Sequence, residues 1–161
     1  MAGLNADRVR ANVQSVLDEI ATAAREAGRD PADVELLAAT KYVEVADMAA
    51  LAEAGIRLVG ENRAQDLEAK VQAHGELFEW DFIGHLQSRK VRQILPHVRL
   101  IHSVASDSVL SELGRHAPPG TEVLVEVNVA GEEGKGGIAP DELGAFLGRS
   151  PVRVAGLMTM P

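Results

Sequence analysis

Thr121-Glu-Val-Leu-Val-Glu-Val-Asn-Val129 decides how this chain folds. Its four valines recur at every second position, which is the period of a β-strand with one buried face. Pro140-Asp-Glu142 follows with a proline and two acids where a helix begins, and the helix is predicted to run to Leu147. A strand over 152–158 comes next. Two strands joined through a helix form a parallel pair, so this part of the chain predicts a βαβ unit.

The same alternation of strands and helices extends back to the N-terminus. The first element is predicted to be a helix over 7–27, capped by Asn5 and ended by Gly28. Further strands are predicted over 34–41, 56–60, 80–84 and 98–104, and further helices over 45–54, 62–73, 88–95 and 106–113. About six strands that alternate with helices predict an α/β fold with a parallel sheet. An open doubly wound sheet and a (β/α) barrel of the TIM type both fit this pattern.

Composition narrows the class of protein. The chain has 161 residues, 46% of them apolar and 25% charged, which fits a single domain over 1–161. Its net charge of −8 argues against non-specific binding to nucleic acid or to anionic membranes. The lack of cysteine excludes disulfides and thiolate chemistry. No signal-peptide pattern and no apolar run of about 18 residues is present, so a cytoplasmic location is expected.

Lys41 is the candidate reactive residue, because it closes the predicted buried strand 34–41. Burial penalises the ammonium form and lowers a lysine pKa. A neutral lysine amine attacks carbonyl compounds and forms Schiff bases, with pyridoxal phosphate (PLP) among its partners. The alternative is a strand-end lysine whose stem lies on the core while its amine reaches water.

Other polar groups lie where strands are predicted to end, which is where parallel sheets and barrels bind ligands. The candidate binding residues there are Asn62, His85, Ser103, Asn128 and Met158. Asn62 fits equally well as a helix N-cap. His85 and His102 are candidate acid–base groups or metal ligands, but five scattered histidines without a His-x-x-x-His pair argue against a metal site.

Two further patterns involve lysines. The segment 131–137 contains Lys135 and looks like a phosphate loop, but Gly136 stands where that motif needs Ser or Thr. We therefore predict a flexible loop, with Lys135 as a weaker site candidate. Asp66 lies one turn before Lys70, which predicts an ion pair within the helix 62–73.

Taken together, these segments resemble the YggS/PROSC family of pyridoxal phosphate homeostasis proteins. The matching stretches, in the family's order and spacing, are Leu36–Lys41, Gly60–Gln65, Trp80–Lys90, Ile101–Ser103, Val127–Glu132 with Lys135 and Gly137, and Gly156–Met158. The resemblance implies a fold like the N-terminal barrel of alanine racemase, with PLP held as a Schiff base on Lys41. It implies storage, buffering or delivery of the cofactor to PLP-dependent client enzymes, without established turnover and therefore without catalytic residues.

The sequence departs from the family in two places. Asp81 stands where the family carries histidine beside the tryptophan. The family also continues past the stretch that ends here at Pro161, through strands whose turns hold the cofactor phosphate. A C-terminally truncated form with about six of the eight barrel strands is therefore expected. Such a form should bind PLP more weakly and self-associate through open strand edges, whereas a full-length form should be monomeric.

Two alternatives to a carrier stay open at this point. One is a PLP-dependent amino-acid racemase or aldolase relative, which needs an acid–base residue opposite Lys41. The other is a remnant that keeps part of the fold and binds no cofactor.

Overall fold

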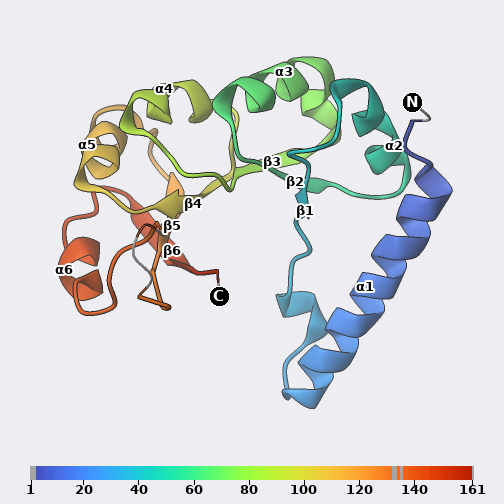
Figure 1. Ribbon diagram of the computed structural model, residues 1–161, viewed down its shortest axis with the longest axis horizontal. Coiled ribbons are helices and arrows are strands. Elements are labelled where there is room, and N and C mark those ends of the chain that lie inside the picture. The colour runs from blue at the N-terminus through green and yellow to red at the C-terminus, as the bar shows by residue number, and fades with distance from the viewer. Residues whose placement is uncertain (1–2, 132–133, 135, 161) are drawn as a thin grey trace.

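The computed structural model describes residues 3–131, 134 and 136–160. Its long N-terminal helix α1, Ala6–Glu26, begins and ends within one residue of the prediction. The side chain of Asn5 accepts a hydrogen bond from the Arg8 N–H, and Gly28 follows the helix in the left-handed conformation, with φ of 69°. The cap satisfies a donor that the first turn leaves without a partner, and glycine adopts positive φ without a steric penalty. In Figure 1, α1 stands at one end of the sheet, beside α2.

The strands form one parallel sheet in which each strand pairs with the next along the chain. The strands are β1 (Ala38–Ala39), β2 (Leu58–Glu61), β3 (Glu79–Phe82), β4 (Leu100–Val104), β5 (Glu122–Glu126) and β6 (Arg153–Met158). This consecutive order excludes the doubly wound sheet, in which the strand order reverses at the middle. It is the order of a (β/α) barrel wall, and the sheet curves accordingly in Figure 1. Within the described residues β1 and β6 do not pair, so the barrel is open.

Helices connect the strands and follow the outer, convex side of the sheet (Figure 1). They are α2 (Met48–Glu53), α3 (Ala64–His74), α4 (Val91–Ile94), α5 (Asp107–His116) and α6 (Leu143–Leu147). Short 3-10 turns over Val45–Asp47 and Ser88–Lys90 precede α2 and α4 and account for the longer helices predicted there. Each predicted helix and strand is present with its bounds shifted by a few residues, except that the first strand is much shorter than predicted.

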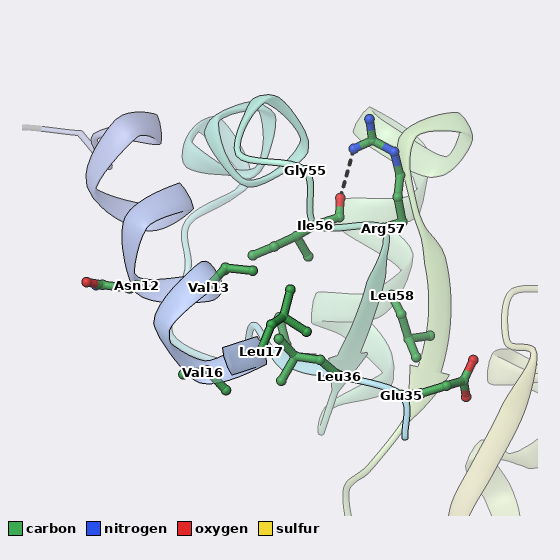
Figure 2. A pocket seen from close by; sticks show the side chains of 11 residues that line it. Asn12, Val13, Val16, Leu17, Glu35, Leu36, Gly55, Ile56, Arg57 and Leu58 are labelled. Atoms are coloured by element: carbon green, nitrogen blue, oxygen red, sulfur yellow. Dashed lines mark hydrogen bonds between the residues drawn. The ribbon is translucent and has the colours of Figure 1, made fainter. Parts of the chain in front are cut away.

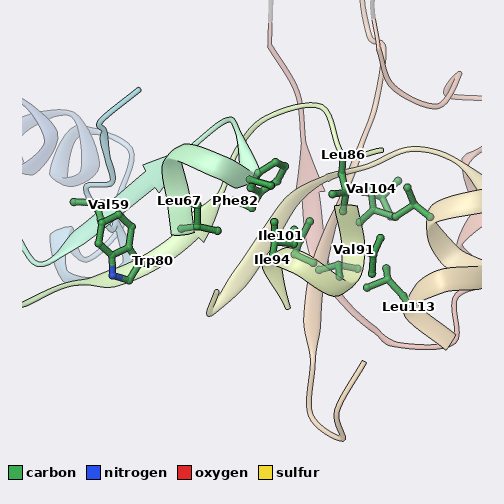
Figure 3. Packing of buried hydrophobic residues seen from close by; sticks show 14 of the residues in the cluster. Val59, Leu67, Trp80, Phe82, Leu86, Val91, Ile94, Ile101, Val104 and Leu113 are labelled. Atoms are coloured by element: carbon green, nitrogen blue, oxygen red, sulfur yellow. The ribbon is translucent and has the colours of Figure 1, made fainter. Parts of the chain in front are cut away.

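The hydrophobic core lies between the convex face of the sheet and these helices. Val123 and Val125 of β5 are fully buried, as the period of two predicted. Figure 3 shows how side chains of the strands, such as Phe82 and Ile101, pack against side chains of the helices, such as Leu67. Residues between these core positions point to the opposite, concave face.

The first strand is where the structure contradicts the prediction. A buried strand over 34–41 was expected, but β1 contains only Ala38–Ala39, and Ala39 is exposed. The physical reason is the open sheet: among the described strands β1 pairs with β2 alone and so lies at an edge. Leu36, two residues before β1, faces α1 instead. Leu36 and Leu17 help to line a cavity of about 450 Å³ between α1 and the amino ends of β1 and β2 (Figure 2).

Candidate functional site

Lys41 lies two residues after β1, in a tight turn. The Thr40 N–H donates to the Gly60 carbonyl of β2 at 3.0 Å, and the Thr40 carbonyl accepts a hydrogen bond from the Val43 N–H at 2.8 Å. The second bond closes a four-residue turn in which Lys41 takes the second position. The backbone of Lys41 is thus anchored to β2 through its neighbour Thr40.

The side chain of Lys41 is exposed, so the prediction that it is buried is wrong. Its Nζ lies 5.2 Å from the centre of the Tyr42 ring, and Tyr42 itself is 88% exposed. An edge strand of two residues cannot enclose the amine that follows it. Lys41 borders a cavity of about 280 Å³ that Asp66 and Lys70 of α3 also line. The environment matches the alternative in which the amine reaches water, and a solvent-accessible amine is open to an aldehyde.

A buried ion pair lies beside the Lys41 turn and joins β2 to α3. Lys70 Nζ lies 2.5 Å from Glu61 Oε1, and the two side chains are 5% and 0% exposed. The ammonium also donates to the Thr40 carbonyl at 2.8 Å, and the Thr40 hydroxyl donates to Glu61 Oε1 at 2.5 Å. The other carboxylate oxygen, Glu61 Oε2, is buried and has no hydrogen-bond partner among the described residues.

This ion pair replaces the predicted pair of Asp66 with Lys70 within the helix. Lys70 turns inward because Glu61, at the end of β2, presents a carboxylate between the sheet and α3. The sequence indicated the side on which each residue lies, but not that the two residues pair. Glu61 is two residues after buried Val59 and so lies on the helix-covered face of β2, and Lys70 is three residues after buried Leu67.

The turn after β3 is wedged between the ends of β2 and β4. A Cβ on Gly84 would lie 2.2 Å from the Asn62 carbonyl oxygen, so only glycine allows the two backbones to approach this closely. On the other side, the buried hydroxyl of Ser103 donates to the Gly84 carbonyl. The ends of three strands are thereby in direct contact. Asn62 does not cap the following helix, because the N-cap position of α3 is Arg63, so the N-cap alternative is wrong.

The remaining candidates also follow the strands. His85 is exposed in the turn after β3. Asn128 follows β5, and its side-chain oxygen accepts a hydrogen bond from the Gly131 N–H at 3.0 Å. Met158 ends β6, and its carbonyl accepts a hydrogen bond from the Val127 N–H at 2.9 Å. Lys135 lies outside the described residues. Because all the strands are parallel, the described candidates lie on the side of the sheet where the strands end, as predicted.

A second charged network lies on the concave face. Asp81, which is 0% exposed, is held by Arg99 Nη2 at 2.8 Å and by His102 Nε2 at 2.9 Å. Arg99 also reaches Glu35, ahead of β1, at 3.1 Å. Burial raises the pKa of Asp81, but the hydrogen bonds from His102 and Arg99 outweigh it and hold the pKa below its usual range. The hydrogen bond to Asp81 in turn raises the pKa of Arg99, and the bond to Glu35 adds to this.

Among the described residues, no group of three or more His, Cys, Asp or Glu side chains is placed to hold a metal ion. Nor does the part of the chain that the structure describes contain a helix of the length and hydropathy needed to span a membrane.

This is an open, TIM-barrel-like α/β protein with its candidate site at the carboxyl ends of the strands. Its class is defined by the consecutive parallel strands, the outer helices and the accessible lysine after the first strand. Comparison with known proteins narrows the class to a family. A pyridoxal phosphate homeostasis protein of Aquifex aeolicus is 38% identical over 154 residues, which are 91% of this chain and 68% of that protein. One from Pseudomonas aeruginosa is 38% identical over 158 residues, 93% of this chain and 69% of that protein. The chain belongs to the family of pyridoxal phosphate homeostasis proteins.

Solved structures share this fold. An unknown protein from Bifidobacterium adolescentis superposes with a TM-score of 0.82 at 32% identity, over 96% of this chain and 70% of that one. PipY of Synechococcus elongatus, solved with PLP bound, superposes with a TM-score of 0.68 at 28% identity, over 90% of this chain and 70% of that one. No protein-family model matches the chain.

Proposed function

We propose that this chain binds PLP and takes part in PLP homeostasis through storage, buffering or delivery of the cofactor. The observation that carries the proposal is the position of Lys41, an accessible amine on an anchored turn at the carboxyl end of β1. Membership of the homeostasis family supports the role, and the related PipY structure with PLP bound supports binding by this fold.

The residues at this edge fit the chemistry of the cofactor. When bound, PLP would supply an aldehyde, which a primary amine would convert to a Schiff base with release of water. On this proposal Lys41 supplies that amine. The rest of the site is formed by Asn62, His85, Ser103, Asn128 and Met158. Ser103 contributes by shape, because its hydroxyl fixes the Gly84 carbonyl beside Asn62.

The role that we propose is that of a carrier for client enzymes. A racemase or aldolase moves a proton on its substrate and needs a second acid–base group opposite the lysine. His102 is a histidine on the concave face, and its Nε2 is engaged by Asp81 at 2.9 Å. Asp81 is in turn neutralised by Arg99, so the arrangement favours a structural role for this histidine over proton transfer.

The test is to follow Schiff-base absorbance while PLP is added to the protein, and then to reduce the complex with borohydride and map the labelled peptide. We expect the label on Lys41 and loss of the absorbance in Lys41→Ala. Lys90→Ala is the matched control, because Lys90 lies on the 3-10 turn before α4 and bonds to Gln93. Absorbance and label that survive Lys41→Ala would refute the assignment. Sustained turnover of an amino acid by the loaded protein would favour the enzyme over the carrier.

A further inference from the structure

We propose that the buried pair of Glu61 and Lys70 is a positioning device for Lys41. The inference rests on the proposed function, in which Lys41 is the residue that binds PLP. Glu61 and Lys70 act through Thr40, the residue before Lys41, and neither is proposed to touch the cofactor.

The geometry around Thr40 carries the inference. Its N–H donates to the Gly60 carbonyl at 3.0 Å, and its hydroxyl donates to Glu61 Oε1 at 2.5 Å. Its carbonyl accepts two hydrogen bonds, one from the Val43 N–H and one from Lys70 Nζ, each at 2.8 Å. Thr40 is 1% exposed, so none of these bonds competes with water. Every polar group of the residue before Lys41 is therefore fixed.

The position of β1 explains why such a device is needed. The strand has two residues, and their ladder partners are Val59 and Gly60 on β2 alone. An edge strand this short has few backbone bonds to define where the next residue stands. Lys70, from α3, adds a charged donor to the carbonyl that starts the Lys41 turn. Fixing this turn before the cofactor arrives reduces the ordering that binding would otherwise require.

Stability alone is a poor explanation for the pair. Burying two charges carries a desolvation penalty that an apolar pair of the same size avoids. Glu61 Oε2 adds to that penalty, since it is buried without a hydrogen-bond partner among the described residues. The pair joins α3 to the Thr40 carbonyl, next to Lys41. Its cost is therefore explained by a role in fixing the position of Lys41.

The experiment removes both charges at once and keeps the volume, as Glu61→Leu with Lys70→Met. Neutral replacement of a buried pair usually preserves or raises stability, so the variant should fold and unfold at an unchanged or higher midpoint. We expect its apparent Kd for PLP, followed by Schiff-base absorbance, to rise about tenfold or more. Borohydride labelling of Lys41 at a fixed PLP concentration should fall in parallel. Lys90→Met is the matched control and should bind PLP as the parent protein does.

The outcomes separate this inference from the proposed function. If Lys41→Ala keeps the absorbance, the proposed function fails and the positioning role fails with it. If Lys41→Ala loses it while the folded double variant binds PLP as tightly as the parent, only the positioning role is overturned. Thr40→Val provides a second variant if the double variant does not fold, because it removes the hydroxyl that bonds Glu61 and keeps the ion pair. A several-fold weaker affinity supports positioning, and unchanged affinity overturns it.

Discussion

Arg99 binds both carboxylate oxygens of Asp81, with Nε 3.0 Å from Oδ1 and Nη2 2.8 Å from Oδ2. Such two-point contacts fix geometry as well as charge. Because Arg99 also reaches Glu35 ahead of β1, the contact ties the middle of the sheet to the segment that leads into its edge strand. The same carboxylate holds His102 of β4.

Asp81→Ala is predicted to lower the free energy of unfolding by about 2–3 kcal/mol. The figure is below the roughly 3–5 kcal/mol typical of breaking a fully buried pair, because Arg99 remains partly in water when its partner is removed. Urea unfolding at neutral pH measures the loss. Asp7→Ala serves as the control, since the pair of Asp7 with Arg10 is exposed and should contribute little. Equal effects of the two substitutions would contradict the structural importance of Asp81.

The stability of the protein should depend on pH through Asp81. Its pKa is lower in the folded than in the unfolded state, so the unfolded state binds the proton more readily. The stabilisation is complete above the unfolded value, near pH 4, and is lost as the pH falls through the folded value. We expect unfolding free energies measured between pH 7 and pH 3 to decline more steeply in the parent than in Asp81→Asn. Parallel profiles would mean that other carboxylates govern acid unfolding.

The carboxyl-edge placement of the candidate residues could be predicted from the sequence, because alternating strands and helices impose a parallel sheet whose strands all end at one side. Asn62 and Ser103 are examples, since each contacts Gly84 at that edge. The exposure of Lys41 could not be predicted in this way. An apolar stretch such as 34–41 indicates burial, but burial depends on whether a neighbouring strand covers β1, which local sequence does not specify.

The pairing of Lys70 with Glu61 could not be predicted from local sequence pattern either. Spacing along the helix favours Asp66 as the partner of Lys70, yet Lys70 bonds Glu61 of the sheet. Helical spacing shows which residues are neighbours on the same helix. The packing of α3 on β2 decides which of the possible partners Lys70 binds. Asp81 gives a similar lesson, because Arg99, which binds its carboxylate, comes from a neighbouring part of the sheet.

Gly84→Ala is predicted to disrupt the candidate site. The added Cβ would lie 2.2 Å from the Asn62 carbonyl oxygen and 2.6 Å from its Cα, and backbone atoms cannot yield as a flexible side chain does. We expect a loss of about 3 kcal/mol or more in unfolding free energy, together with weaker PLP binding. Gly144→Ala is the matched control, because nothing lies within 4 Å of a Cβ at that helical position. That variant should be neutral or more stable by about 0.5–1 kcal/mol. A Gly84→Ala protein with parental stability would show that the two turns are not in contact.

The free edge at β6 should make the protein self-associate. Leu157 in β6 is 55% exposed, and Val129, just after β5, is 56% exposed. These apolar side chains lie near the outer edge of β6, which has no partner among the described strands. Unpaired edges with apolar side chains template pairing with another chain, and a charge placed there prevents it. We expect sedimentation velocity to show association that increases with protein concentration and that weakens about tenfold or more in Leu157→Lys. Leu77→Lys is the control, because Leu77 is 42% exposed but lies on the turn after α3, away from the edge. Association that is equally strong in both variants would place the contact elsewhere, and a monomer at all concentrations would show that the edge is protected.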